Sequence, residues 1–168
     1  MRMATAQVVR TAAALFLTAF VLQTFHEVEH VAQVYQRLWL GVGPQSARGI
    51  LFFLDLEWNH FLFNTGYFLL LAAISFFIFF HPAFTFIRSG RMALRFLVAG
   101  SLLQAYHVVE HTVRMGQFFN TNCTPCPGIL GWYIDIAYLH FVFNTLTWLL
   151  PLAVAPAFLA ILRQSSQK

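Results

Sequence analysis

FHEVEHVAQ occupies positions Phe25–Gln33 and YHVVEHTVR occupies Tyr106–Arg114, so two related stretches lie 81 positions apart (25 to 106). A second pair follows them, because LDLEWNHFLFNT at Leu54–Thr65 matches IDIAYLHFVFNT at Ile134–Thr145 with an offset of 80 (54 to 134). Self-similarity at a fixed offset is typical of chains built from repeated structural units. We therefore expect two tandem copies of one unit, related by an offset of about 80 residues.

Each copy contains two long apolar stretches. The chain of 168 residues is 59% hydrophobic and 10% charged, whereas soluble domains carry about 25% charged residues. Stretches of about 20 apolar residues can cross a bilayer as helices, and we predict them at about 11–35, 55–80, 92–118 and 135–162. The expected fold class is all-α: an integral membrane four-helix bundle built from two tandem helical-hairpin repeats. We expect a single transmembrane domain over residues 1–168, with repeat 1 at about 11–80 and repeat 2 at about 92–162.

The basic residues predict the orientation of the hairpins. Seven lie on the side of the termini and the middle loop, namely Arg2, Arg10, Arg88, Arg91, Arg95, Arg163 and Lys168, and three lie on the other side, namely Arg37, Arg48 and Arg114. Because Lys and Arg concentrate on the cytoplasmic side, we predict a multi-pass protein of the cell membrane with both termini in the cytoplasm. Its partner is the lipid bilayer. The basic residues form no run and no aromatic stripe, so no nucleic-acid partner is expected.

Histidine and glutamate recur at helical spacing in both copies. Residues at positions i, i+3 and i+4 share one helix face, and the remaining histidine of each copy lies at the same predicted depth. Ionisable residues inside spanning helices are costly and usually functional. The predicted metal ligands are His26, Glu29, His30 and His60 in the first copy and His107, Glu110, His111 and His140 in the second. We expect the two sets to face each other near the outer side of the membrane.

These ligand sets predict a pseudo-symmetric dinuclear centre with two transition-metal ions. Imidazole ligands suit iron, copper and zinc alike, so the residues do not select the metal. Glu29 and Glu110 are the candidate catalytic residues, as a bridging or proton-handling pair. A centre of this kind within apolar helices favours an oxidoreductase that acts on an apolar or lipid-like substrate. Whether the chain is an enzyme stays open at this point.

Three alternatives remain open. The first is a zinc-dependent membrane hydrolase, because His26–His30 fits both the His-Glu-x-x-His and the His-x-x-Glu-His patterns of zinc proteases. The second is a b-type haem protein with histidines from facing helices as axial ligands. The third is a non-catalytic metal-binding or structural subunit, with other membrane subunits as partners. The histidine clusters partly resemble the histidine boxes of membrane desaturases and hydroxylases. The chain has no His-x-x-His-His box, so we assign it to no family.

Three further pairs complete the expectations: Asp55 with Asp135, Asn64 with Asn144, and Cys123 with Cys126. The aspartates fall in first helical turns, where a carboxylate caps the helix. The asparagines share a helix face with a predicted histidine ligand, and we expect them either to form hydrogen bonds between helices or to orient that histidine. The cysteines lie in one loop on the predicted outer side, where a structural disulfide is expected.

Overall fold

The computed structural model describes residues 2–51, 57–81 and 88–166 of the chain. Within these residues the helices are α1 (Arg2–Leu38), α2 (Glu57–Phe80), α4 (Arg88–Thr121), the short 3₁₀ helix η1 (Leu130–Trp132) and α5 (Ile136–Ser166). The all-α prediction is therefore confirmed for the described part of the chain. Helices α1 and α4 extend beyond both ends of the apolar stretches predicted at 11–35 and 92–118. Asp55 lies outside the described residues, and its capping role stays a prediction.

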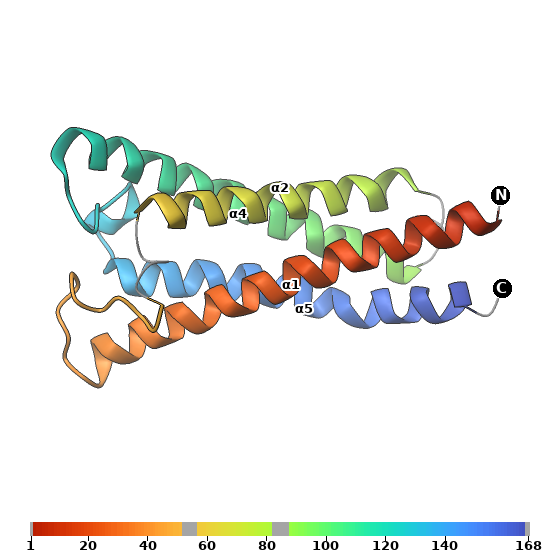
Figure 1. Cartoon of the computed structure of the whole chain (residues 1–168), viewed down its shortest axis with the longest axis horizontal. Helices are drawn as coiled ribbons and strands as arrows, with labels where there is room; N and C mark the ends of the chain where they lie inside the picture. The colour runs from red at the N-terminus through yellow and green to blue at the C-terminus, as the bar shows by residue number, and fades with distance from the viewer. Residues whose placement is uncertain (1, 52–56, 82–87, 167–168) are drawn as a thin grey trace.

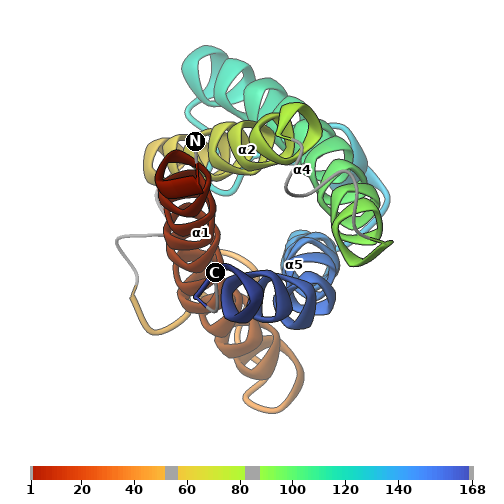
Figure 2. The ribbon, with the colours of Figure 1, turned by 90° about the vertical axis from the view of Figure 1, so that its right-hand side faces the viewer.

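The four long helices run side by side along the length of the molecule (Figure 1). Seen from the end that carries the termini, their order around the bundle is α1, α2, α4 and α5 (Figure 2). Helix α1 packs against α5, and α2 packs against α4. The connecting segments 39–51 and 122–135 lie together at the opposite end, which we call the loop end.

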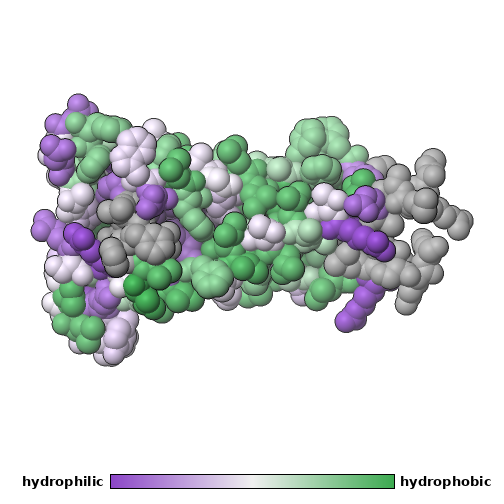
Figure 3. All heavy atoms as spheres, in the orientation of Figure 1, coloured by the Kyte–Doolittle hydropathy of each residue, from purple (hydrophilic) through white to green (hydrophobic). Residues whose placement is uncertain are grey.

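The described part of the chain has four helices that are long and apolar enough to cross a membrane. Their candidate spans are Gln7–Leu38, Glu57–Phe80, Gly90–Thr121 and Ile136–Ala160. The visible face carries a hydrophobic belt around its middle and hydrophilic side chains toward both ends (Figure 3). Exposed apolar side chains on every helix, such as Phe76 and Leu102, suit hydrocarbon and not water. The predicted bilayer environment fits this surface.

The interior of the bundle changes character along its length. Toward the termini it is apolar, with Phe16, Leu71, Leu97 and Phe158 among its buried side chains. The rings of Phe16 and Phe158 stack there with centroids 4.5 Å apart. Toward the loop end the buried side chains are His, Glu, Gln and Asn. Burying so many polar groups is costly unless they are bonded to one another or to a ligand, so the candidate site lies in this part of the interior.

Asp135 begins α5 as the sequence predicts. Its Oδ1 accepts the N–H of Ala137 at 3.0 Å, the pattern of a carboxylate that caps a helix N-terminus. Its Oδ2 also forms an ion pair with Arg37 at 2.5 Å, which connects the end of α1 to the start of α5. Pro151 and Pro156 lie inside α5, where neighbouring helices can compensate for the backbone bonds they remove.

Candidate metal centre

Six buried histidines meet at the loop end of the bundle. They are His26 and His30 on α1, His60 on α2, His107 and His111 on α4, and His140 on α5, and none exposes more than 3% of its surface. They form two groups in which one nitrogen of each ring lies within 4.8 Å of the others. We call His26, His30 and His60 the first triad, and His107, His111 and His140 the second triad. The structure thus brings together all six predicted histidines.

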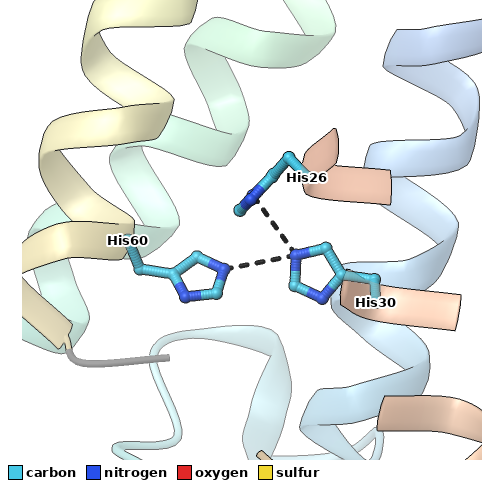
Figure 4. Close-up of side chains that lie close together, drawn as sticks. All are labelled: His26, His30 and His60. Atoms are coloured by element: carbon cyan, nitrogen blue, oxygen red, sulfur yellow. Dashed lines mark hydrogen bonds between the residues drawn. The ribbon is translucent and has the colours of Figure 1, made fainter. Parts of the chain in front are cut away.

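The first triad directs three ring nitrogens toward one point (Figure 4). His30 Nε2 lies 3.2 Å from His26 Nε2 and 3.2 Å from His60 Nε2. Nitrogens bound to one tetrahedral ion at ~2.0–2.1 Å lie roughly 3.3–3.4 Å from each other. The first triad therefore has the spacing of a three-histidine metal site.

Gln33 sets the protonation of the first triad. Its Oε1 lies 2.8 Å from His30 Nδ1, and an amide oxygen only accepts hydrogen bonds. With Gln33 Oε1 as the acceptor, His30 carries its proton on Nδ1 and presents the lone pair of Nε2 to the other two rings. Without a metal ion, this one lone pair on His30 Nε2 would have to accept hydrogen bonds from both His26 and His60. A metal ion would instead bind the Nε2 lone pair of each of the three rings. Sequence reasoning missed this contribution of Gln33.

The second triad has a different neighbour. His111 Nε2 lies 3.1 Å from His107 Nε2, and the rings of His111 and His140 stack with centroids 4.9 Å apart. Arg114 Nη1, however, lies 2.7 Å from His140 Nε2. A guanidinium is always charged and only donates, so it takes the lone pair with which His140 would bind an ion. His140 becomes a ligand through Nε2 only when Arg114 releases that nitrogen.

The two triads adjoin each other. The ring of His60 lies 5.1 Å from that of His111 and 5.4 Å from that of His140, measured between centroids. The rings of His30 and His140 are 5.5 Å apart. The six imidazoles are therefore one continuous cluster, and ions held by the two triads would be close neighbours.

Glu29 and Glu110 are buried beside the histidines, with 1% and 0% of their surfaces exposed. The Glu29 carboxylate accepts the backbone N–H groups of residues 50–51 at 3.0 Å. Glu110 Oε1 accepts those of residues 129–130 at 2.8 and 2.9 Å. Neither glutamate belongs to a metal-ligating group within the described ranges. In the structure each carboxylate holds a connecting segment against the bundle. The predicted roles of Glu29 and Glu110 as ligands and catalytic residues stay predictions.

A glycine makes each of these contacts feasible. Gly49 has φ +74° and Gly128 has φ +69°, a left-handed conformation that other residues adopt at a cost. A Cβ atom at either position would also overlap the carboxylate of the glutamate beneath it. The amide of Gln36 exchanges two hydrogen bonds with the backbone of Gly49, and Gln117 does the same with Gly128, at 2.7–2.9 Å. We call each arrangement of glutamate, glutamine and glycine a loop clasp.

Glu57 and Arg114 form a buried ion pair that sequence reasoning missed. Arg114 Nη2 lies 2.6 Å from Glu57 Oε1, and both side chains are more than nine-tenths buried. The same oxygen accepts the N–H of Cys126 at 3.1 Å. Cys126 forms a disulfide with Cys123, which confirms the predicted bond, while its structural role stays a prediction. A network therefore runs from the disulfide loop through Glu57 and Arg114 to the second triad.

Matched glutamine–asparagine contacts lie on the other side of the histidines. Gln23 Nε2 donates to Asn144 Oδ1 at 2.8 Å, and Gln104 Nε2 donates to Asn64 Oδ1 at 2.9 Å. The asparagine amides donate in turn to the carbonyls of residues 140 and 60 at 2.9 Å. Asn64 Nδ2 also lies 3.3 Å from His111 Nε2. Each of the two glutamine–asparagine contacts joins the first half of the chain to the second.

Comparisons of the chain with protein-family models, with curated proteins and with solved structures find no match. Function is therefore inferred from the chemistry of the site. Three buried imidazoles are a suitable donor set for zinc, copper or iron. Three protein ligands leave a position open for water or a reactant, so a triad can support catalysis as well as storage.

Proposed function

We propose that this chain is an integral membrane metalloprotein with a dinuclear histidine centre, and that it acts as an oxidoreductase on an apolar or lipid-like substrate. The observation that carries the proposal is the convergence of three buried ring nitrogens in the first triad, where His30 Nε2 lies 3.2 Å from Nε2 of both His26 and His60 and all three lie within 4.8 Å of one another. Three neutral imidazoles in a bundle interior have little structural reason to face one another. A metal ion supplies that reason, because it bonds to all three at once.

The adjacency of the two triads supports a second ion. Two-metal centres hold their ions about 3.5–4 Å apart, and ring separations of 5.1–5.5 Å between the triads are consistent with such a pair. Iron or copper with dioxygen is the redox system that best suits an imidazole-rich site with open positions. The second ion binds more weakly in this proposal, because Arg114 must first release His140 and leaves a positive charge nearby.

We also propose that the two halves are copies of one hairpin. The two loop clasps and the two glutamine–asparagine contacts support this, since their members occupy matching positions of the two halves. The distribution of Lys and Arg supports cytoplasmic termini and a metal centre near the outer leaflet of the cell membrane. The bilayer then separates the cytoplasm from the reaction.

The geometry favours this proposal over the alternatives. A haem group needs a flat space between facing histidines, whereas neighbouring rings of this cluster approach to centroid distances of 4.6–5.5 Å. A zinc hydrolase needs a carboxylate beside its activated water. Glu29 and Glu110 direct their carboxylates to loop backbone, and Glu27 accepts from the hydroxyl of Thr145 at 2.6 Å. Each of the three carboxylates therefore already accepts a hydrogen bond from the protein, which supports the proposal over a hydrolase.

Elemental analysis and the optical spectrum of the protein purified in mild detergent test the proposal. We expect two iron or copper ions per chain, removed by a chelator in two steps. His30→Ala should abolish the tighter step and His111→Ala the weaker one. His81→Ala is the matched control, because His81 lies at the far end of α2, about 30 Å from His60 along the helix. A Soret band would show haem instead, and absence of bound metal would favour a structural subunit.

A further inference from the structure

An apolar groove lies between α1 and α2, beside the metal centre. Its volume is about 200 Å³, and it is lined by Leu22, Leu62, Phe63, Gly66, Tyr67 and Leu70. It extends from exposed Leu62, 60% of whose surface is accessible, to Tyr67 at 2%. The Tyr67 hydroxyl donates to the carbonyl of Thr147 at 3.1 Å, so the polar group of the lining already has a partner. The groove therefore offers a ligand apolar contacts only.

The inner wall of the groove reaches the first triad. The ring of Phe63 stacks on that of His26 with centroids 4.3 Å apart and planes at 27°. One aromatic ring therefore separates the groove from a proposed metal ligand.

The matching position in the second half carries a larger side chain. Phe143 stacks on His107 with centroids 5.0 Å apart, as Phe63 does on His26. Three residues further on, however, the first half has Gly66 and the second has Leu146. A Cβ atom added at Gly66 would meet nothing within 4 Å, so its missing side chain leaves open space. Helices α4 and α5 also pack against each other more extensively than α1 and α2 do.

We propose that this groove is the entry through which a single alkyl chain, from a lipid-like substrate dissolved in the bilayer, reaches the first triad. Gly66 opens the entry, and Phe63 separates it from His26. The lining selects the occupant, because a polar ligand would lose its hydrogen bonds to water without gaining others. The surrounding bilayer concentrates apolar molecules at its mouth. The role of the groove in delivering substrate rests on the proposed function. Its occupancy by an alkyl chain does not depend on a bound metal.

Photo-crosslinking with a long-chain alkanol that carries a terminal diazirine tests the groove. The protein is reconstituted in phospholipid vesicles, and labelled residues are mapped by mass spectrometry. We expect label on Leu62 and Phe63 in the wild type. In Gly66→Leu that label should fall roughly tenfold or more, since even one methylene group in an apolar pocket changes binding by about 10–200-fold. Gly116→Leu is the matched control, because Gly116 lies on α4 and also has nothing within 4 Å of an added Cβ.

The outcomes distinguish the entry from its rivals. Equal labelling of Leu62 and Phe63 in Gly66→Leu would overturn the proposal, as would label spread evenly over all four helices. A reduction of the labelling by excess phospholipid as strong as that by unlabelled alkanol would show that the groove is a site for bilayer lipid only. Leu146→Gly should create new label at Phe143, and this second variant keeps the test valid if Gly66→Leu folds poorly. Metal content is measured on the same samples, so loss of the proposed metal centre and loss of the groove are scored separately.

Discussion

The two triads consist of the same residue type at the same helical spacing, yet they are not equivalent. In the first triad, Gln33 Oε1 accepts a hydrogen bond from Nδ1 of His30, so Nε2 of that ring is available to bind an ion. In the second, Arg114 occupies the matching position of the chain and contacts Nε2 of His140. The ligands alone therefore do not define a metal site. The neighbour that contacts a ring decides whether its lone pair is available.

Replacement of Arg114 by Gln should have the largest effect on this comparison. The variant leaves the buried carboxylate of Glu57 without its partner, and breaking a buried ion pair costs about 3–5 kcal/mol. We expect the free energy of unfolding, measured by SDS titration in mixed micelles, to fall by that amount. A loss below about 1 kcal/mol would show that the pair is solvated in the membrane-embedded protein.

The double variant Arg114→Gln with Glu57→Gln separates stability from metal binding. Removing both charges leaves no unpaired buried ion, so most of the lost stability should return. The second triad then has the glutamine neighbour of the first. We expect its ion to resist the chelator about as well as the ion of the first triad. Two widely separated chelation steps in the double variant would contradict the role given to Arg114.

Substitution of the glycine in either loop clasp should lower the free energy of unfolding by a similar amount. Gly49→Ala and Gly128→Ala each force a left-handed conformation and an overlap with a buried carboxylate, which together cost about 2–3 kcal/mol. Gly41→Ala is the control, because Gly41 has φ +62° and nothing within 4 Å of an added Cβ. Its cost should be the conformational part alone, about 1 kcal/mol. Equal losses at all three glycines, by the same SDS titration, would show that the carboxylate contacts contribute nothing.

The glutamine–asparagine contacts should matter less. Gln23→Leu and Gln104→Leu each remove an interhelical hydrogen bond, and such bonds within membranes contribute about 0.6 kcal/mol on average and up to about 1.7 kcal/mol. The loss for Gln23 should be slightly larger, because its amide also lies 3.2 Å from the hydroxyl of Thr147. A difference above about 1 kcal/mol between the losses of the two variants would show that the two contacts contribute unequally to stability.

Tyr67→Phe is expected to have the smallest effect. It removes one hydrogen bond to the carbonyl of Thr147, so the free energy of unfolding should fall by about 0.5–1 kcal/mol. The lining of the groove becomes no more polar, and alkanol labelling of Phe63 should stay at the wild-type level. Loss of that label would show that Tyr67 shapes the groove through its hydroxyl.

The helices and the six histidines could be predicted, because apolar length and helical spacing are local properties of the sequence. The positions of Glu29 and Glu110 could not, since they depend on where the connecting segments cross the end of the bundle. Gln23 and Gln104 recur at the same offset as the histidines, and so do Gln36 and Gln117. Extending the self-comparison by a few residues would have identified them. The sequence presents Arg114 only as a basic residue on the predicted outer side. The residues next to it in the sequence do not reveal Glu57 as its partner.

The loop clasps have a consequence for how the protein matures. Each is made of a carboxylate, an amide and backbone groups, and none of its bonds involves an ion. The histidine cradle is therefore held in shape by the chain itself, unlike a zinc finger, which folds only with its metal. On the proposed function, metal binding can then follow membrane insertion as a separate late step. Protein made under metal starvation should keep its fold in the bilayer and bind its ions later.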